Sequence, residues 1–227
     1  MTDTMPSPGR LASNRHTAIL LAILFAIAAG GLLSGGRADS AAPANRLPTY
    51  AILAAAQVLL VRYVRAGLRR QGRSLAEEAG LRRVSVRSWL FDAAVAAVFI
   101  AVSRLLILGF RQIVGPDDSH TSFLMPHSLL EKSAWVLLSI VAGVCEELTF
   151  RTYLQRQLGA FFRSPLLGVL TQGVIFGVTH GYQGWKPMLT ISFFGVLFGL
   201  QAWWRGNVRA AILAHAAVDI FGGLFPN

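Results

Sequence analysis

Charged residues are scarce in this sequence. Asp, Glu, Lys and Arg make up 14% of its 227 residues, whereas soluble domains carry about 25%. Apolar residues reach 54%, and they gather in long windows without any charge. This composition excludes a disordered chain, a coiled coil and an ordinary water-soluble enzyme. It predicts an integral membrane protein built as an all-α, polytopic bundle of transmembrane helices.

Cysteine and lysine are scarce as well. The single cysteine, Cys145, excludes an internal disulfide and a cysteine-rich metal site. Lys132 and Lys186 are the two lysines, so the net charge of +10 rests almost entirely on arginine. These arginines flank apolar stretches, as the positive-inside rule requires, and we therefore expect no nucleic-acid partner. The sequence has no Walker loop and no internal repeat, so nothing in it indicates nucleotide-driven transport.

Seven apolar stretches follow a polar amino-terminal segment. Residues 1–16 contain Pro and Gly without an apolar period, and we expect them to form a disordered tail. The apolar stretches are residues 17–33, 49–66, 88–110, 133–150, 165–180, 187–204 and 207–225. A bilayer crossing needs about 20 mainly apolar residues, and about 17 can suffice. The sequence therefore predicts about seven transmembrane helices.

Arginine is densest in the linker 62–87, which predicts that this linker is cytoplasmic. Successive transmembrane helices alternate in direction, so counting outward from this linker places the amino terminus inside and the carboxyl terminus outside. We expect a multi-pass protein of a bacterial inner membrane. The linker belongs to an amino-terminal set of transmembrane helices at 17–128. A second region at 129–225 holds most of the unusual polar residues, and we expect it to be the catalytic core.

Ionisable side chains inside apolar helices are costly, and each is therefore a functional hypothesis. They are Asp92, Arg104, Glu146, Glu147, Arg151, His180, His215 and Asp219. Asp92 and Arg104 lie on one helix about 18 Å apart, too far to pair with each other. We interpret both as structural anchors.

The two adjacent glutamates are expected to have different roles. Glu147 and Arg151 are spaced i,i+4 with the acid first, the favoured order for a helical ion pair. Adjacent helical residues point about 100° apart, so Glu146 faces elsewhere without a partner on its own helix. Such a carboxylate is a candidate general base. Cys145 is interpreted as a small core residue rather than a nucleophile.

The histidines complete a candidate site. His215 and Asp219 are spaced i,i+4 and share one helix face, and His180 ends an apolar stretch. Two histidines and a carboxylate from three helices could position a water or bind a divalent metal. Each histidine could instead be a core residue bonded to a backbone carbonyl.

These residues form three short motifs in order: E-E-x-x-x-R at Glu146–Arg151, F-x-x-x-H at Phe176–His180 and H-x-x-x-D at His215–Asp219. The set resembles the motifs of the CPBP family of intramembrane proteases. That family includes the type II CAAX prenyl endopeptidases and bacterial relatives linked to bacteriocin processing and immunity. The resemblance covers residues 130–222.

The resemblance implies an intramembrane endopeptidase with its catalytic cavity inside the membrane. Its substrate would be a membrane-embedded or lipid-anchored protein or peptide. Glu146 and His180 would activate water, His215 and Asp219 would stabilise the oxyanion, and Glu147 and Arg151 would support them. It leaves open a divalent metal such as zinc, held by Glu146, His180 and His215. The sequence lacks H-E-x-x-H, so it does not support a zincin-type site.

One departure from the family concerns Asp219, which stands where relatives usually have Asn. An ionised Asp would repel an oxyanion, so Asp219 must be protonated, orient His215 or bind a metal. Two other functions remain open: a proton-coupled transporter, and a catalytically silent scaffold or immunity protein of the same fold. For Glu146 to lie at the same depth in the membrane as His180, its helix must be long. We expect one long helix over about 133–160.

Overall fold

The computed structural model describes residues 9–38, 45–115 and 121–225, and within these ranges the chain forms helices and no strands. The longer helices are α1 (Asn14–Ala38), α2 (Leu47–Arg69), α4 (Val86–Val114), α5 (Leu129–Glu146), α7 (Pro165–Val178), α8 (Trp185–Arg205) and α9 (Arg209–Leu224). The shorter ones are α3 (Leu75–Glu78) and α6 (Gln155–Phe162). The all-α prediction is confirmed.

Among the described residues, five helical segments are long and apolar enough to cross a membrane. Four of them are α2, α4, α8 and the part of α1 at Asn14–Leu33, and the fifth is one continuous helix at Leu129–Phe162. The apolar helices α7 and α9 are shorter, with 14 and 16 residues. Together these segments agree with the prediction of about seven transmembrane helices.

The long helix over 133–160 expected from the sequence is present, because α5 runs without a break into α6. Its start is fixed by a capping box, in which Ser128 accepts from the Glu131 backbone N–H and Glu131 reaches back to Ser128. Its middle, Glu147–Leu154, is a π-helix that the sequence did not predict. All eight residues of this π-helix are buried.

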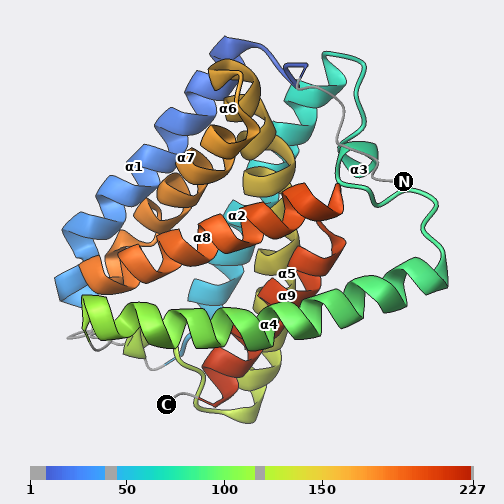
Figure 1. Cartoon of the computed structure of the whole chain (residues 1–227). Coiled ribbons are helices and arrows are strands. Elements are labelled where there is room, and N and C mark those ends of the chain that lie inside the picture. The colour runs from blue at the N-terminus through green and yellow to red at the C-terminus, as the bar shows by residue number, and fades with distance from the viewer. Residues whose placement is uncertain (1–8, 39–44, 116–120, 226–227) are drawn as a thin grey trace.

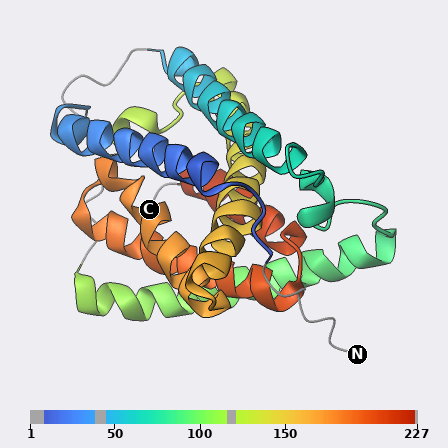
Figure 2. The same cartoon turned by 90° about the horizontal axis from the view of Figure 1, so that it is seen from above.

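The helix α5 lies at the centre of the bundle, between α2 and α9 (Figures 1 and 2). The helices α7 and α8 pack closely because small residues meet there: a Cβ on Gly173 would lie 2.8 Å from the backbone nitrogen of Val196. The helix α4 crosses the outside of α8 and α9. This arrangement encloses the end of α5, the end of α7 and the middle of α9.

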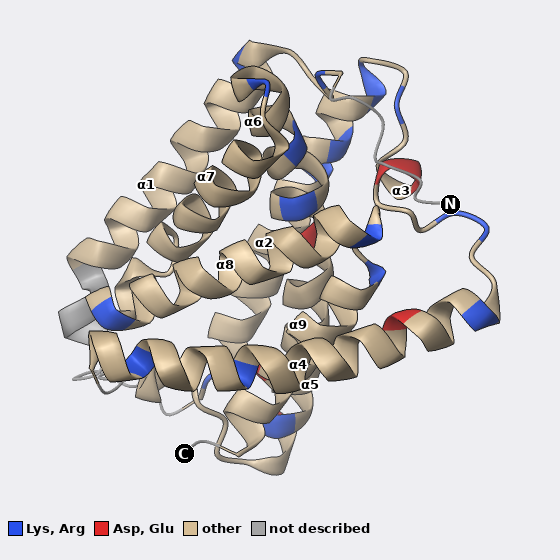
Figure 3. Ribbon diagram, viewed as in Figure 1, with Lys and Arg blue, Asp and Glu red and all other residues tan. Residues whose placement is uncertain are grey.

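Two largely buried acids tie the basic segments together at one end of the bundle. Glu78 pairs with Arg156 at 2.6 Å, and Asp92 pairs with Arg205 at 2.7 Å and with Arg209 at 2.5 Å. Figure 3 shows the basic segments gathered along the upper and right-hand edges of that view. Arg156 and Arg209 therefore contact the linker 62–87 itself, through Glu78 and the Gly80 carbonyl. Asp92 acts as the structural anchor that its position predicted.

The expectation of a disordered tail over 1–16 is wrong for residues 11–16. Leu11 and Ala12 are buried, and Gln157 holds both: its Oε1 accepts from the Leu11 N–H at 2.8 Å and its Nε2 donates to the Ala12 carbonyl at 2.8 Å. The helix α1 then begins at Asn14. Residues 1–8 lie outside the described residues.

Candidate active site

The site forms where α5 becomes the π-helix. Gly143 lies one turn before Glu146, and a Cβ there would come 2.9 Å from the backbone nitrogen of Ala216. The absence of a side chain at Gly143 therefore lets α5 approach α9 beside His215. π-helical turns within α-helices occur frequently at functional sites, and this one presents both Glu147 and Arg151 to the interior.

A buried chain of three charged or polar groups supports the site. The predicted Glu147–Arg151 pair forms, with Oε1 and Nη1 3.1 Å apart and neither side chain exposed. The same Glu147 oxygen lies 2.7 Å from His215 Nδ1. A carboxylate accepts, so Nδ1 carries a proton and donates a hydrogen bond to Glu147. His215 is therefore oriented by Glu147, and its Nε2 faces the opposite way.

Aromatic rings enclose the guanidinium of Arg151. Its Cζ lies 4.3 Å from the centroid of Phe176 and 5.3 Å from that of Phe198. The Phe198 ring also stacks on His215, with centroids 5.2 Å apart. Cation–π contacts of this kind stabilise a desolvated cation. Arg151 thus connects the rigid aromatic core to the carboxylate that holds His215.

Glu146 lies on the other side of the His215 ring. Its Oε2 is 3.6 Å from His215 Nε2, and Asp219 Oδ2 is also 3.6 Å from that nitrogen. The other Glu146 oxygen accepts from the Gln57 side-chain amide of α2. About a third of the Asp219 side chain is exposed, against 9% of that of Glu146. His215 Nε2 therefore lies between two carboxylates, one buried and one accessible.

His180 is connected to the site by Phe176, which contacts both histidines. Its Nδ1 lies 2.8 Å from the Phe176 carbonyl and donates to it, which leaves Nε2 as an acceptor in the neutral ring. The Phe176 centroid is 4.8 Å from the His180 ring and 5.9 Å from that of His215. No ion pair joins His180 to Glu146 in the described part of the chain. Of the two histidines, it is His215 that pairs with Glu146.

The described residues do not form a metal site. Among them, no group of three or more His, Cys, Asp or Glu side chains is arranged to hold a metal ion. In the set that the sequence left open, Glu146, His180 and His215, both histidines use Nδ1 for hydrogen bonds within the protein, which leaves Nε2 as the ring nitrogen that could bind a metal.

Two residues near the site were not predicted from the sequence. Gln57 is a lone amide within the apolar stretch 49–66, and that isolation is the signal that could have found it. Tyr182 follows His180, and their ring centroids are 6.2 Å apart. Burial, and to a smaller extent the charges of Glu146 and Asp219, raise the pKa of Tyr182 to about 12. Its phenol therefore keeps its proton beside the two carboxylates.

The fold and the site define a class: a polytopic helical membrane protein that buries a glutamate–histidine cluster among its helices. Residues 129–221 match the family model of the type II CAAX prenyl endopeptidase Rce1-like proteins. The match confirms the resemblance drawn from the three motifs, and this region of the chain is similar to the type II CAAX prenyl endopeptidases. The family is one of proteases, which supports a peptidase. Comparisons with curated proteins and with solved structures gave no significant match.

Proposed function

We propose that the protein is an intramembrane endopeptidase that hydrolyses a peptide bond of a membrane-embedded or lipid-anchored protein or peptide. One observation carries the proposal. His215 is fixed through Nδ1 by a fully buried carboxylate, and its Nε2 is turned towards Glu146 and the accessible Asp219. The catalytic core at 129–225 takes one further group, the Gln57 amide, from the amino-terminal helices. A bacterial inner membrane is the expected location.

In this reaction Glu146 acts as the general base. Gln57 holds one carboxylate oxygen, and the other remains directed at the space beside His215 Nε2. A water there transfers a proton to Glu146 while its oxygen attacks the scissile carbonyl carbon. The Nε2 of His180 accepts a hydrogen bond from the second hydrogen of that water and orients it. Glu146 then returns the proton to the leaving nitrogen as the carbon–nitrogen bond breaks.

The developing oxyanion is stabilised by donors on α9. A proton on His215 Nε2 makes that nitrogen a donor, and the carboxylates on both sides of the ring compensate its positive charge. A protonated Asp219 supplies a second hydrogen bond. Arg151 does not contact the substrate in this scheme, because its guanidinium is enclosed by Glu147, Phe176 and Phe198. It positions His215 through Glu147.

The function is tested by mapping new protein termini in the membrane proteomes of cells that express the wild type or Glu146→Ala. We expect a set of internal cleavages that is present with the wild type and absent with the variant, each within or next to a membrane anchor. Equal amounts of the two proteins in the membrane fraction serve as the control. Identical terminus maps at equal expression would contradict the proposal.

Replacing Asp219 by Asn is expected to preserve most of the activity. The His-orienting role is already filled by Glu147, which binds Nδ1 at 2.7 Å, so a permanent amide donor at 219 can serve the oxyanion. Asp219→Ala, which removes the donor, should lose activity by about 10²–10³-fold. The measurement is hydrolysis of one substrate by wild type and both variants, with and without a chelator. Equal losses in Asn and Ala variants would show that the carboxylate charge itself is needed.

A further inference from the structure

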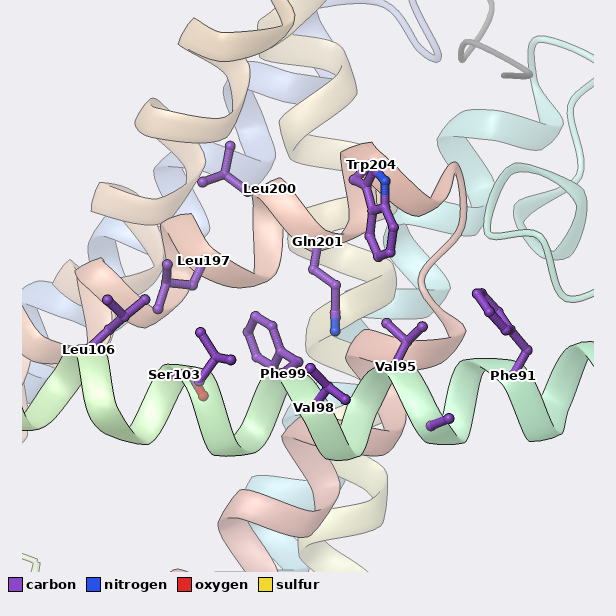
Figure 4. Close-up of a pocket in the computed structure, with 12 residues that line it drawn as sticks. Phe91, Val95, Val98, Phe99, Ser103, Leu106, Leu197, Leu200, Gln201 and Trp204 are labelled. Atoms are coloured by element: carbon purple, nitrogen blue, oxygen red, sulfur yellow. The ribbon is translucent and has the colours of Figure 1, made fainter. Parts of the chain in front are cut away.

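An apolar groove lies between α4 and α8, on the side of α8 that faces away from α7 (Figure 4). Its volume is about 580 Å³. The walls include Phe91, Val98, Phe99 and Leu106 of α4 and Leu197 and Trp204 of α8. Several of these side chains are also exposed on the surface, Val98 by 64%. The groove therefore opens to the surroundings of the transmembrane helices, which are lipid.

One polar side chain points into this groove without a partner. Gln201 extends from α8 towards α4, and its amide ends among the apolar side chains (Figure 4). The residue is 6% exposed, and neither its Nε2 nor its Oε1 has a hydrogen-bond partner among the described residues. Ser103, the other polar residue of the groove, donates to the Ile100 carbonyl of its own helix. A buried amide without partners is costly, so a ligand with a complementary polar group is expected here.

The position of Gln201 along α8 indicates which polar group that is. It precedes Arg205 by four residues, or about 6 Å along the helix, and Arg205 belongs to the basic end of the bundle. Trp204 lies between them, as aromatic residues do at the boundary of the hydrocarbon layer. Gln201 thus sits just inside this boundary. The ester carbonyls of a glycerophospholipid lie at the same boundary, and a carbonyl oxygen accepts from an amide N–H.

The length of the groove and the positive charge at its basic end fit the same ligand. From Phe91 to Leu106 the groove follows α4 for about 22 Å, which is enough for a chain that spans one leaflet of roughly 15 Å, half of the hydrocarbon thickness. Arg87 precedes Phe91 by one helical turn, on the same side of α4. It is exposed and has no partner among the described residues. Its guanidinium is available for a phosphate at the basic end.

We propose that this groove binds one glycerophospholipid, whose acyl chain fills the space between α4 and α8. The ester carbonyl of that chain accepts a hydrogen bond from Gln201 Nε2, and the phosphate pairs with Arg87. The ligand is a membrane lipid rather than a substrate, because neither His215 nor Glu146 lines the groove.

The bound lipid reaches the candidate active site through Phe198. This ring lies 4.8 Å from the Phe99 ring of the groove wall and 5.2 Å from the His215 ring. A lipid chain that holds α4 against α8 therefore keeps Phe198 pressed against His215. The effect of the lipid on hydrolysis rests on the proposed function, whereas the binding itself does not.

The binding is tested by native mass spectrometry of the purified full-length protein with two phosphatidylglycerols, one diacyl and one with ether-linked chains that lack the carbonyls. We expect the wild type to retain the diacyl lipid about fivefold more tightly, which corresponds to one net hydrogen bond. Gln201→Leu, of similar size, should bind both lipids equally. Equal binding of the two lipids by the wild type, or a preference that survives in Gln201→Leu, would overturn the hydrogen bond to Gln201.

The location is tested with a matched pair of variants. Val98→Trp fills the groove, and Val174→Trp places the same ring on the exposed surface of α7, where Val174 is 54% exposed. We expect Val98→Trp to lose the tightly retained lipid and Val174→Trp to keep it. Retention of the lipid by both variants would place it outside the groove. Because lipid is counted directly, these outcomes do not depend on whether the protein hydrolyses peptides.

Discussion

Glu146→Gln is expected to lower hydrolysis by about 10²–10⁴-fold, the usual contribution of a positioned general base. The amide is nearly isosteric and can still contact Gln57, but it cannot take a proton from water. The helical circular dichroism and the melting temperature in detergent should match the wild type, because the side chain remains in place. The measurement is the initial rate of cleavage of a substrate found by terminus mapping.

The matched control is Glu77→Gln, which makes the same chemical change on the short helix α3. Glu77 is half-exposed and pairs with Arg82 at the surface, so its loss should leave the rate unchanged. A folded Glu146→Gln protein with more than about 10% of the wild-type rate is incompatible with Glu146 as the general base.

Arg151→Ala is expected to cost about 3–5 kcal/mol of unfolding free energy, because it removes the cation that compensates the buried charge of Glu147 and leaves the hydrogen bond from His215 as its partner. Activity should fall as well, since Glu147 positions His215. Adding Glu147→Gln to Arg151→Ala removes the stranded charge and should restore part of the stability. The measurement is a double-mutant cycle by denaturant titration in detergent.

An exposed pair provides the comparison for this cycle. Glu77 and Arg82 interact at the surface with both side chains about half-exposed, and such pairs contribute little. The cycle on Glu77→Gln and Arg82→Ala should therefore show almost no coupling. If the double variant at 147 and 151 is destabilised by the sum of its two single losses, the buried residues are not coupled, and the proposed positioning of His215 by Arg151 through Glu147 is wrong.

Much of the fold could be predicted because its signals are local. Apolar length predicted the helices, and the i,i+4 spacing with the acid first predicted the Glu147–Arg151 pair. The π-helix could not be predicted in this way, because it depends on packing between distant elements. Its Tyr153, for example, contacts Thr17 of α1 through their hydroxyls at 2.9 Å.

The candidate site shows the same limit. The motifs named Glu146, His180, His215 and Asp219, but their spacing did not say which carboxylate each histidine meets. Glu147 was expected to pair with Arg151 alone, and it also binds His215, which lies 68 residues further along the chain. The Gln57 contact joins residues 89 positions apart. Such contacts are fixed by helix packing, which no local pattern in one sequence records.

The hydrogen bonds of Gln157 to Leu11 and Ala12 set an order of events during synthesis. Gln157 is synthesised about 145 residues after Leu11 and Ala12. At 5–20 residues per second this is a delay of roughly 7–30 s. During that interval Leu11 and Ala12 lack the hydrogen bonds to Gln157. Leu11 and Ala12 can therefore dock against Gln157 only after α6 has left the ribosome.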